Sequence, residues 1–126
     1  MPRPPRQFTL VGLAAALALS GAGCADDSPP TRVKDGRATV TLDDFSITPQ
    51  RLRARPGEVA FRAVNRGAIG HTLRVMRGDH EVAGVTTLLP GASAKASGTF
   101  ERGRYDLVCI LGNHEDLGMY GTLTVR

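Results

Sequence analysis

Four side chains of this sequence could together bind a metal ion, and three of them come from one short segment. Five positions lead from a cysteine to a histidine, and five more lead to a methionine, in the segment CILGNHEDLGM. Singly, each residue has an ordinary explanation as a buried thiol, a loop imidazole or a core thioether. Together they place three different donors in one loop, and a second histidine heads an alternating apolar row earlier in the chain. The four residues are His71, Cys109, His114 and Met119.

The donor types favour copper over zinc. Zinc rarely accepts a thioether, whereas methionine sulfur suits cuprous ion. Two imidazoles and a thiolate with a weak axial thioether form the ligand set of a blue-copper site. The sequence therefore predicts one mononuclear copper site. A binuclear copper centre is not expected, because it would need a second cysteine in this loop.

A catalytic alternative would use Cys109 as a nucleophile and His114 as its base. The sequence shows no third group to orient that base and no oxyanion-binding device, and Met119 would have no role. We therefore expect that the protein is not an enzyme.

The elements that must position these residues are expected to be short strands. Apolar and polar residues alternate through 40–42, 52–54, 59–63 and 71–75, and further strands are expected at 92–100, 105–109 and 121–126. Turn residues, mainly Pro-Gly and Arg-Gly pairs, interrupt the chain at intervals of about ten residues, which is typical of a β-sandwich or barrel. No window supports a long amphipathic helix. Residues 83–89 could form either a short helical turn or an irregular strand.

Residues 38–126 resemble the cupredoxins of the plastocyanin and azurin kind. The first half reads FSITPQRLRARPGEVAFRAVNRG ahead of His71, with Pro-Gly before a strand and Asn-x-Gly before the histidine. The second half reads LLPGASAKASGTFERGRYDLVC, followed by His114, Met119 and YGTLTV. The resemblance implies an all-β Greek-key β-sandwich of about seven to eight strands with one type 1 copper at one end. By motif position it implies His71, Cys109, His114 and Met119 as the metal ligands.

The sequence departs from the family's pattern at three places. Thr72 follows the first histidine where many relatives carry Asn. The hydrogen bond that fixes the copper loops is therefore either supplied by Thr72 or absent. The cysteine-to-histidine spacing resembles azurin, while the histidine-to-methionine spacing resembles plastocyanin. Leu107 and Val108 stand where aromatic residues are often found, which leaves the electron route less obvious.

The N-terminus has the features of a secretory signal peptide over residues 1–23. A basic start precedes the apolar run 8–19, which is too short to span a bilayer, and small residues follow. The segment SGAGC resembles the lipobox of bacterial lipoproteins, which implies lipidation at Cys24. Ordinary signal-peptidase cleavage near Ala22 or Ala25 is the alternative.

The rest of the chain divides into a tether and one domain. Residues 24–36 are polar, contain two prolines and show no hydrophobic period, so we expect a flexible tether followed by a copper-binding domain at 37–126. If Cys24 is lipidated or removed, Cys109 has no disulfide partner, which favours a metal-binding role for its thiol. A disulfide between the two cysteines is the alternative.

Length, composition and charge limit the functions that are available. The chain has 126 residues, of which 41% are hydrophobic and 22% charged, in agreement with a single domain. Its formal net charge of +4 includes Arg3 and Arg6 of the leader. The charge that remains is too small to predict a nucleic-acid partner. Arg51, Arg53 and Arg55 share the outward face of one strand, either as a solvated face or as a docking patch.

These observations predict an extracytoplasmic protein that carries single electrons between redox proteins. His114 is the expected electron port, because it lies on the loop while His71 is anchored deeper. An apolar docking surface is expected around it from Ile69, Ile110, Leu111 and Leu117. We expect a monomer that is secreted across a bacterial cytoplasmic membrane and is either lipid-anchored or free in the periplasm or outside the cell. The alternatives are copper storage or delivery with the same ligands, and a metal-free structural sandwich.

Overall fold

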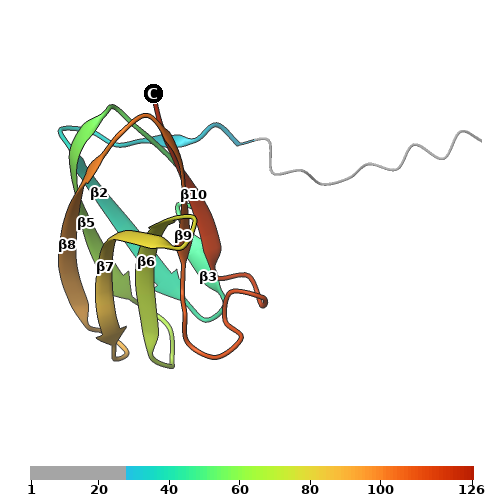
Figure 1. Ribbon diagram of the computed structural model, residues 1–126. Coiled ribbons are helices and arrows are strands. Elements are labelled where there is room, and N and C mark those ends of the chain that lie inside the picture. Colours follow the sequence, from blue (N-terminus) through green and yellow to red (C-terminus); the bar gives the residue numbers. More distant parts are fainter. Residues whose placement is uncertain (1–27) are drawn as a thin grey trace, which may run out of the picture.

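A computed structural model describes residues 28–126, which form two β-sheets packed face to face (Figure 1). The larger sheet has the strand order β1-β4-β10-β9-β6-β7, and the smaller sheet has the order β3-β2-β5-β8. The leader and Cys24 lie outside the described residues. The strands are β1 (Thr31–Arg32), β2 (Arg37–Asp43), β3 (Ser46–Thr48), β4 (Arg51–Ala54), β5 (Gly57–Asn65), β6 (His71–Arg77), β7 (His80–Leu88), β8 (Ser93–Phe100), β9 (Gly103–Val108) and β10 (Tyr120–Val125).

Strands that are distant in sequence lie side by side in both sheets. β5 pairs with β2 in parallel and with β8 in antiparallel orientation. β10 lies between β4, to which it is parallel, and β9, which then pairs with β6. Figure 1 shows β7 next to β8, where the two sheets approach each other. No helix long and apolar enough to cross a membrane occurs in residues 28–126.

Alternation along the strands produces the core between the sheets. In β5, Val59, Phe61 and Ala63 are buried, while the residues between them are less buried. Phe100 packs edge to face against Phe61 on one side, at 5.8 Å between ring centroids, and against Tyr105 on the other, at 5.0 Å. These aromatic contacts join the smaller sheet to the larger one. The core is therefore continuous across both layers.

The predicted all-β sandwich is confirmed, with ten strands in the described residues instead of seven to eight. The additional strands are β1 and β3, which are too short to show an alternating pattern. β1 pairs with β4 within the stretch predicted to be a tether, so the sheet begins at Thr31, six residues before Arg37. Residues 83–88 belong to β7, whose pairing with β6 shifts register twice, and Leu89 begins the loop that follows. Of the two alternatives for this stretch, the irregular strand is therefore correct.

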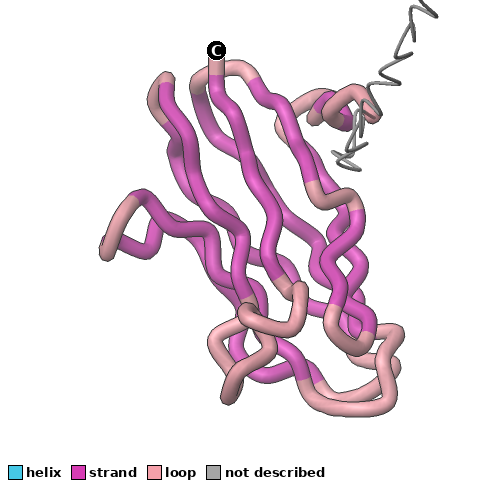
Figure 2. The backbone as a smooth tube through the Cα atoms, turned by 90° about the vertical axis from the view of Figure 1, so that its right-hand side faces the viewer, coloured by secondary structure: helices cyan, strands magenta, loops and turns pink. Residues whose placement is uncertain are grey.

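Four loops meet at one end of the sandwich, which we call the loop end. They are residues 44–45, 66–70, 89–92 and 109–119. Backbone hydrogen bonds tie two of these loops to strand ends, because the amide of Arg66 donates to Leu42 of β2 and that of Gly91 donates to Asn65 of β5. A third bond, from the amide of Cys109 to Met119, closes the loop 109–119. Figure 2 shows the loops gathered at the end opposite the C-terminus. The four candidate metal ligands, His71, Cys109, His114 and Met119, lie here.

Candidate metal centre

The loop end brings together three of the four predicted metal ligands. His71 is the first residue of β6, Cys109 directly follows β9, and His114 lies in the loop between β9 and β10. Each offers one ligand atom, and these three atoms lie within 4.8 Å of one another. The sulfur of Cys109 is 3.6 Å from Nδ1 of His114. Two nitrogens and one sulfur therefore converge on one point between the loops.

The ring of His71 has one nitrogen engaged and one nitrogen free. Nε2 lies 3.0 Å from Oδ1 of Asp44, whereas Nδ1 is buried and has no hydrogen-bond partner. A hydrogen bond from the amide of Ala68, followed by that from His71, lowers the pKa of Asp44 below its usual value, so this carboxylate is ionised at neutral pH. An ionised carboxylate only accepts hydrogen bonds, so Nε2 is the donor in this contact, and in the neutral ring Nδ1 then carries the lone pair. A buried nitrogen without a partner is costly unless something binds it.

Asp44 also holds the loop that precedes His71. Its carboxylate accepts hydrogen bonds from the amides of Ala68, at 3.0 Å to each oxygen, and Ile69, at 3.4 Å. Gly67 passes so close to the pair that a Cβ there would collide with Asp44 and lie 2.7 Å from Nε2 of His71. The absence of a side chain at Gly67 is therefore what allows the aspartate to reach the histidine.

Asn65 fixes the same loop from the other side. It is fully buried, and its side-chain amide donates to the carbonyls of Ile69 and Leu88, each at 2.8 Å. Its side-chain oxygen accepts from the amide of Gly67, also at 2.8 Å. These three bonds tie residues 66–70 to the end of β7. His71 consequently starts β6 from a restrained backbone.

Phe45 contacts the second histidine from the same turn that holds Asp44. Its ring meets the ring of His114 edge to face, with centroids 5.5 Å apart and an interplanar angle of 88°. The residue has a φ of 64°, which a phenylalanine rarely adopts. Its carbonyl oxygen would lie 2.7 Å from a Cβ at position 118, so the chain needs glycine there. The Asp44–Phe45 turn thus restrains both histidine rings.

Thr72 connects the sulfur of Cys109 to the neighbouring strand. Its amide donates to this sulfur at 3.4 Å, and its hydroxyl donates to the same atom at 3.6 Å. The hydroxyl oxygen also accepts from the amide of Ile110 at 3.0 Å. The sequence left open whether Thr72 supplies a hydrogen bond that fixes the loops or whether that bond is absent. The structure shows that Thr72 supplies it. Donors directed at sulfur stabilise negative charge on it.

Met119 is fully buried and is the last residue of the loop 109–119 between β9 and β10. Its amide donates to the carbonyl of His114 at 2.9 Å, and its carbonyl accepts from the amide of Cys109 at 3.1 Å. The backbone of the methionine is therefore bonded to two of the three clustered residues. Positive φ angles at Gly112 and Gly118 let the loop turn back to make these contacts.

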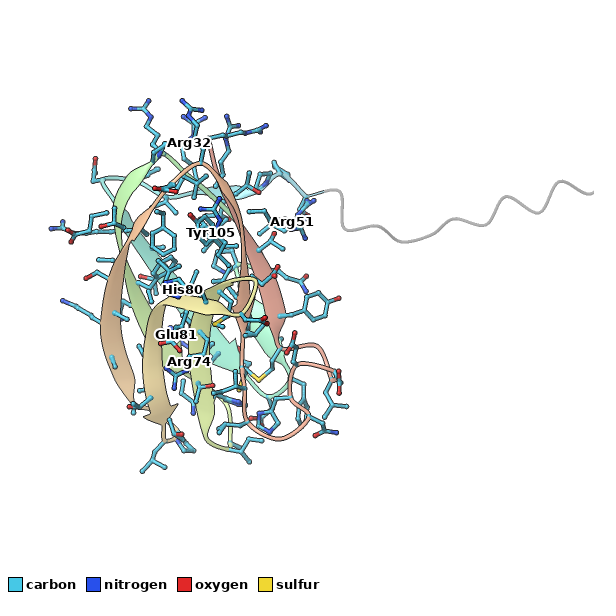
Figure 3. All side chains as sticks on the ribbon, in the orientation of Figure 1. Arg32, Arg51, Arg74, His80, Glu81 and Tyr105 are labelled. Carbon is cyan, nitrogen blue, oxygen red and sulfur yellow. The ribbon has the colours of Figure 1, made fainter. Side chains whose placement is uncertain are left out.

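The two histidines of the cluster differ in exposure, and the remaining histidine lies elsewhere. His71 is fully buried, while His114 is partly exposed. His80 is exposed and begins β7 opposite Arg77, at the far end of β6 from His71 (Figure 3). Its neighbour Glu81 pairs with Arg74 at 2.8 Å. His80 therefore takes no part in the cluster.

Exposed apolar side chains surround the cluster. Six large hydrophobic side chains are exposed among residues 28–126, and all lie in the loops of the loop end or at the first residue of β10: Phe45, Ile69, Leu89, Ile110, Leu117 and Tyr120. Three of the four residues expected to form an apolar surface are among them. Leu111 differs, because it is partly buried against the core.

Sequence reasoning missed several residues that build this end. Asp44 and Phe45 lie in a turn that resembles any other polar turn with one aromatic residue, 27 positions before His71. Leu89 precedes a Pro-Gly turn, which gives no sign that its side chain is exposed beside a site. In the sequence, Asn65 is only part of an Asn-x-Gly pattern. Their roles depend on contacts between loops, which no local pattern reveals.

The donor set matches a copper ion that changes oxidation state. Imidazole nitrogens suit both copper states, and a thiolate and a thioether suit cuprous ion. The free Nδ1 of His71 and the convergence of the three ligand atoms agree with a metal bound between them. The residues present therefore fit a single copper ion.

Solved structures with the same architecture are cupredoxins. A dithionite-reduced auracyanin from Roseiflexus castenholzii superposes with a TM-score of 0.69 at 16% identity, covering 72% of this chain and 97% of the other. An azurin from Methylomonas sp. strain J gives 0.64 at 13% identity, covering 71% and 97%. Auracyanin A from Chloroflexus aurantiacus, described as a "blue" copper protein, gives 0.61 at 15% identity, covering 71% and 99%. No protein-family model and no curated protein matches the sequence. The likeness establishes the cupredoxin fold.

Proposed function

We propose that this protein of cupredoxin fold binds one copper ion and carries single electrons between redox proteins outside the cytoplasm. The observation that carries the proposal is the buried cluster of His71, Cys109 and His114, in which His71 keeps an unpartnered Nδ1. The proposed ligands are these three residues and Met119. Copper bound there would supply a centre that alternates between Cu(I) and Cu(II).

The surrounding residues keep the proposed ligands in place. Asp44 holds His71, Phe45 restrains His114, and Thr72 donates two hydrogen bonds to the sulfur of Cys109. A ligand set restrained in this way changes little when the charge of a bound ion changes, which suits an electron carrier. The buried ring of His71 and the buried thiol also keep water away from the site.

The proposed route for electrons leads through His114. It is the histidine of the cluster with exposed surface, and the apolar side chains of the loop end surround it. A small apolar surface can dock another protein briefly and release it quickly. The proposed partners are therefore redox proteins with a complementary apolar surface, and the protein itself acts as a monomer.

Copper storage or delivery with the same ligands is the alternative function. A delivery protein must release its ion, and it would therefore be expected to exchange metal readily and to favour Cu(I). Here the ligand residues are buried or partly buried, and hydrogen bonds with Asp44 and Thr72 hold His71 and Cys109 in place, which favours retention. We infer electron transfer on this ground.

The proposed location follows from the N-terminal sequence. Residues 1–23 would direct export, and Cys24 would carry a lipid that anchors the tether and domain to the membrane. Mass spectrometry of the protein purified from membranes tests this: a diacylglyceryl mass on Cys24 supports the anchor, and an unmodified N-terminus near residue 22 or 25 contradicts it.

The function is tested by the visible spectrum of the protein loaded with Cu(II). We expect an intense thiolate-to-copper band that disappears on reduction, returns on reoxidation and is accompanied by one retained copper per chain. His71→Gln should lose the band, while the matched variant His80→Gln, at the other end of β6, should keep it. Ready exchange of the copper with a chelator, together with tighter binding of Cu(I) than of Cu(II), would support delivery. Copper uptake without the band would contradict the proposed ligand set.

A further inference from the structure

A basic cleft lies at the end of the sandwich opposite the loop end. It has a volume of about 570 Å³ and is lined by Arg32 of β1, the turn 33–36, residues 53–59 from the end of β4 to the start of β5, and Arg126. Figure 3 shows Arg32, one of its residues, at the end where Figure 1 places the C-terminus. We use the name basic cleft for its five cationic residues: Arg32, Lys34, Arg53, Arg55 and Arg126.

The positive charge of the basic cleft is not neutralised by its neighbours. Two acidic residues, Asp35 and Glu58, also line it, so basic residues outnumber acidic ones. The three ion pairs found within residues 28–126 join His71 to Asp44, Arg74 to Glu81 and Arg77 to Glu101, and none includes a residue of the cleft. Four of the five cationic side chains are exposed, and Arg53 is partly exposed. These side chains are free to meet anions in solution.

The loop end has the opposite charge character. Its loops contain three acidic residues, Asp44, Glu115 and Asp116, and one basic residue, Arg66. An anionic surface would therefore attract the basic cleft and repel the loop end. This difference in charge between the two ends could orient the domain on an anionic surface, with the basic cleft facing that surface.

The chain enters the fold at the basic cleft. Val33 and Arg32 line the cleft, and the amide of Val33 donates to the carbonyl of Arg53. Seven residues lead from Cys24 to Thr31, and even a fully extended chain of this length spans no more than about 25 Å. A lipid on Cys24, as in the proposed function, would hold the basic cleft close to the membrane surface. The short distance from Cys24 and the positive charge therefore both favour the basic cleft as the surface that faces the membrane.

We propose that the basic cleft docks the domain on the anionic headgroups of the membrane and turns the loop end toward the aqueous side. The phosphate groups of the lipids are the recognised chemistry, and arginine pairs with them in bidentate geometry. Docking in this orientation leaves His114 and its apolar surroundings accessible to soluble partners. The orientation rests on the proposed anchor, whereas the affinity for headgroups can be measured without it.

The test is co-sedimentation with lipid vesicles. Residues 25–126 contain both sheets and the whole core, so this lipid-free form is suitable. Two vesicle types are compared: phosphatidylcholine alone, and equal parts of phosphatidylcholine and phosphatidylglycerol. We expect binding to the second type only, and weaker binding as salt is added.

Two double variants with the same change of charge show where the binding occurs. Arg55→Glu with Arg126→Glu alters exposed residues of the basic cleft and should weaken binding by roughly tenfold or more. Arg62→Glu with Lys95→Glu alters exposed residues on the smaller sheet and should weaken it far less. Equal loss in both variants, or no preference for phosphatidylglycerol, would overturn the proposal. Binding to a DNA duplex but not to vesicles would also overturn it.

The outcome is independent of copper binding. The thiolate-to-copper band of each variant reports on the loop end, and we expect it to be unchanged by both double substitutions. A protein that lacks the band but binds anionic vesicles through the basic cleft would refute the proposed electron transfer while supporting the docking. The reverse result would refute the docking alone.

Discussion

The two ends of the sandwich are built and charged in different ways. The loop end has no strand pairing of its own, and side-chain hydrogen bonds from Asp44, Asn65 and Thr72 hold its loops together. The opposite end is formed by paired strands, and the charged side chains of its basic cleft take part in no ion pair within residues 28–126. The comparison shows that contacts between loops build the metal site, whereas strand pairing builds the opposite end. Substitutions at the two ends should therefore affect different measurements.

The largest expected effect on the site comes from Cys109→Ser. A serine hydroxyl does not provide the thiolate bond to copper, so the variant should lose the visible band completely. Its fold should persist, because serine is nearly isosteric and can still accept the hydrogen bond from the amide of Thr72. Absorbance of the copper-loaded variant and its far-ultraviolet circular dichroism check both points. A band of ordinary intensity in this variant would show that copper binds elsewhere.

A core substitution should give the opposite pattern. Leu123 is fully buried in β10, away from the loops. Leu123→Ala should lower the free energy of unfolding by about 2–5 kcal/mol through lost apolar contacts and a cavity. The folded fraction should keep the wavelength and intensity of the visible band. Chemical denaturation and absorbance measure these effects, and a strongly altered band would mean that the scaffold and site are not separable.

How far the sequence predicts this structure depends on the range of the interactions. Alternation in 59–63 and 71–75 predicts strands because burial on one face of a sheet is a local pattern. The row headed by His71 and the loop from Cys109 to Met119 could be predicted for the same reason. β1 and β3 are too short for any period, and their pairing depends on distant strands. Asp44 and Phe45 contact the histidines across 27 and 69 positions of sequence.

A smaller effect is expected from Asp44→Asn. Asparagine can still accept the hydrogen bond from Nε2 of His71, so the ring should keep its position. The substitution removes a negative charge next to a proposed ligand, and this charge favours the more positive Cu(II) state. The reduction potential should therefore rise while the visible band remains. Asp43→Asn, which removes the same charge one residue earlier, is the control. An unchanged or lowered potential in Asp44→Asn would contradict the role of this carboxylate.

The smallest effect is expected from Phe45→Ala. The edge-to-face contact with His114 would be lost, which should lower the free energy of unfolding by about 1 kcal/mol. Loss of an exposed ring beside His114 should also slow electron exchange between copies of the protein, measured by line broadening in magnetic resonance spectra. Leu89→Ala removes a comparable exposed side chain without contacting His114. Slower exchange in both variants would assign the effect to the apolar surface, and slower exchange in Phe45→Ala alone would assign it to the position of the histidine. Unchanged exchange in both would contradict a docking role for this surface.

The most direct test of the copper site is a crystal structure of the copper-loaded protein with anomalous data at the copper edge. We expect one anomalous peak per chain, bound by Nδ1 of His71, the sulfur of Cys109, Nδ1 of His114 and the sulfur of Met119. The hydrogen bond between Nε2 of His71 and Asp44 should be retained. A peak bound through Nε2 of His71, or a peak outside the loop end, would contradict the proposed copper site.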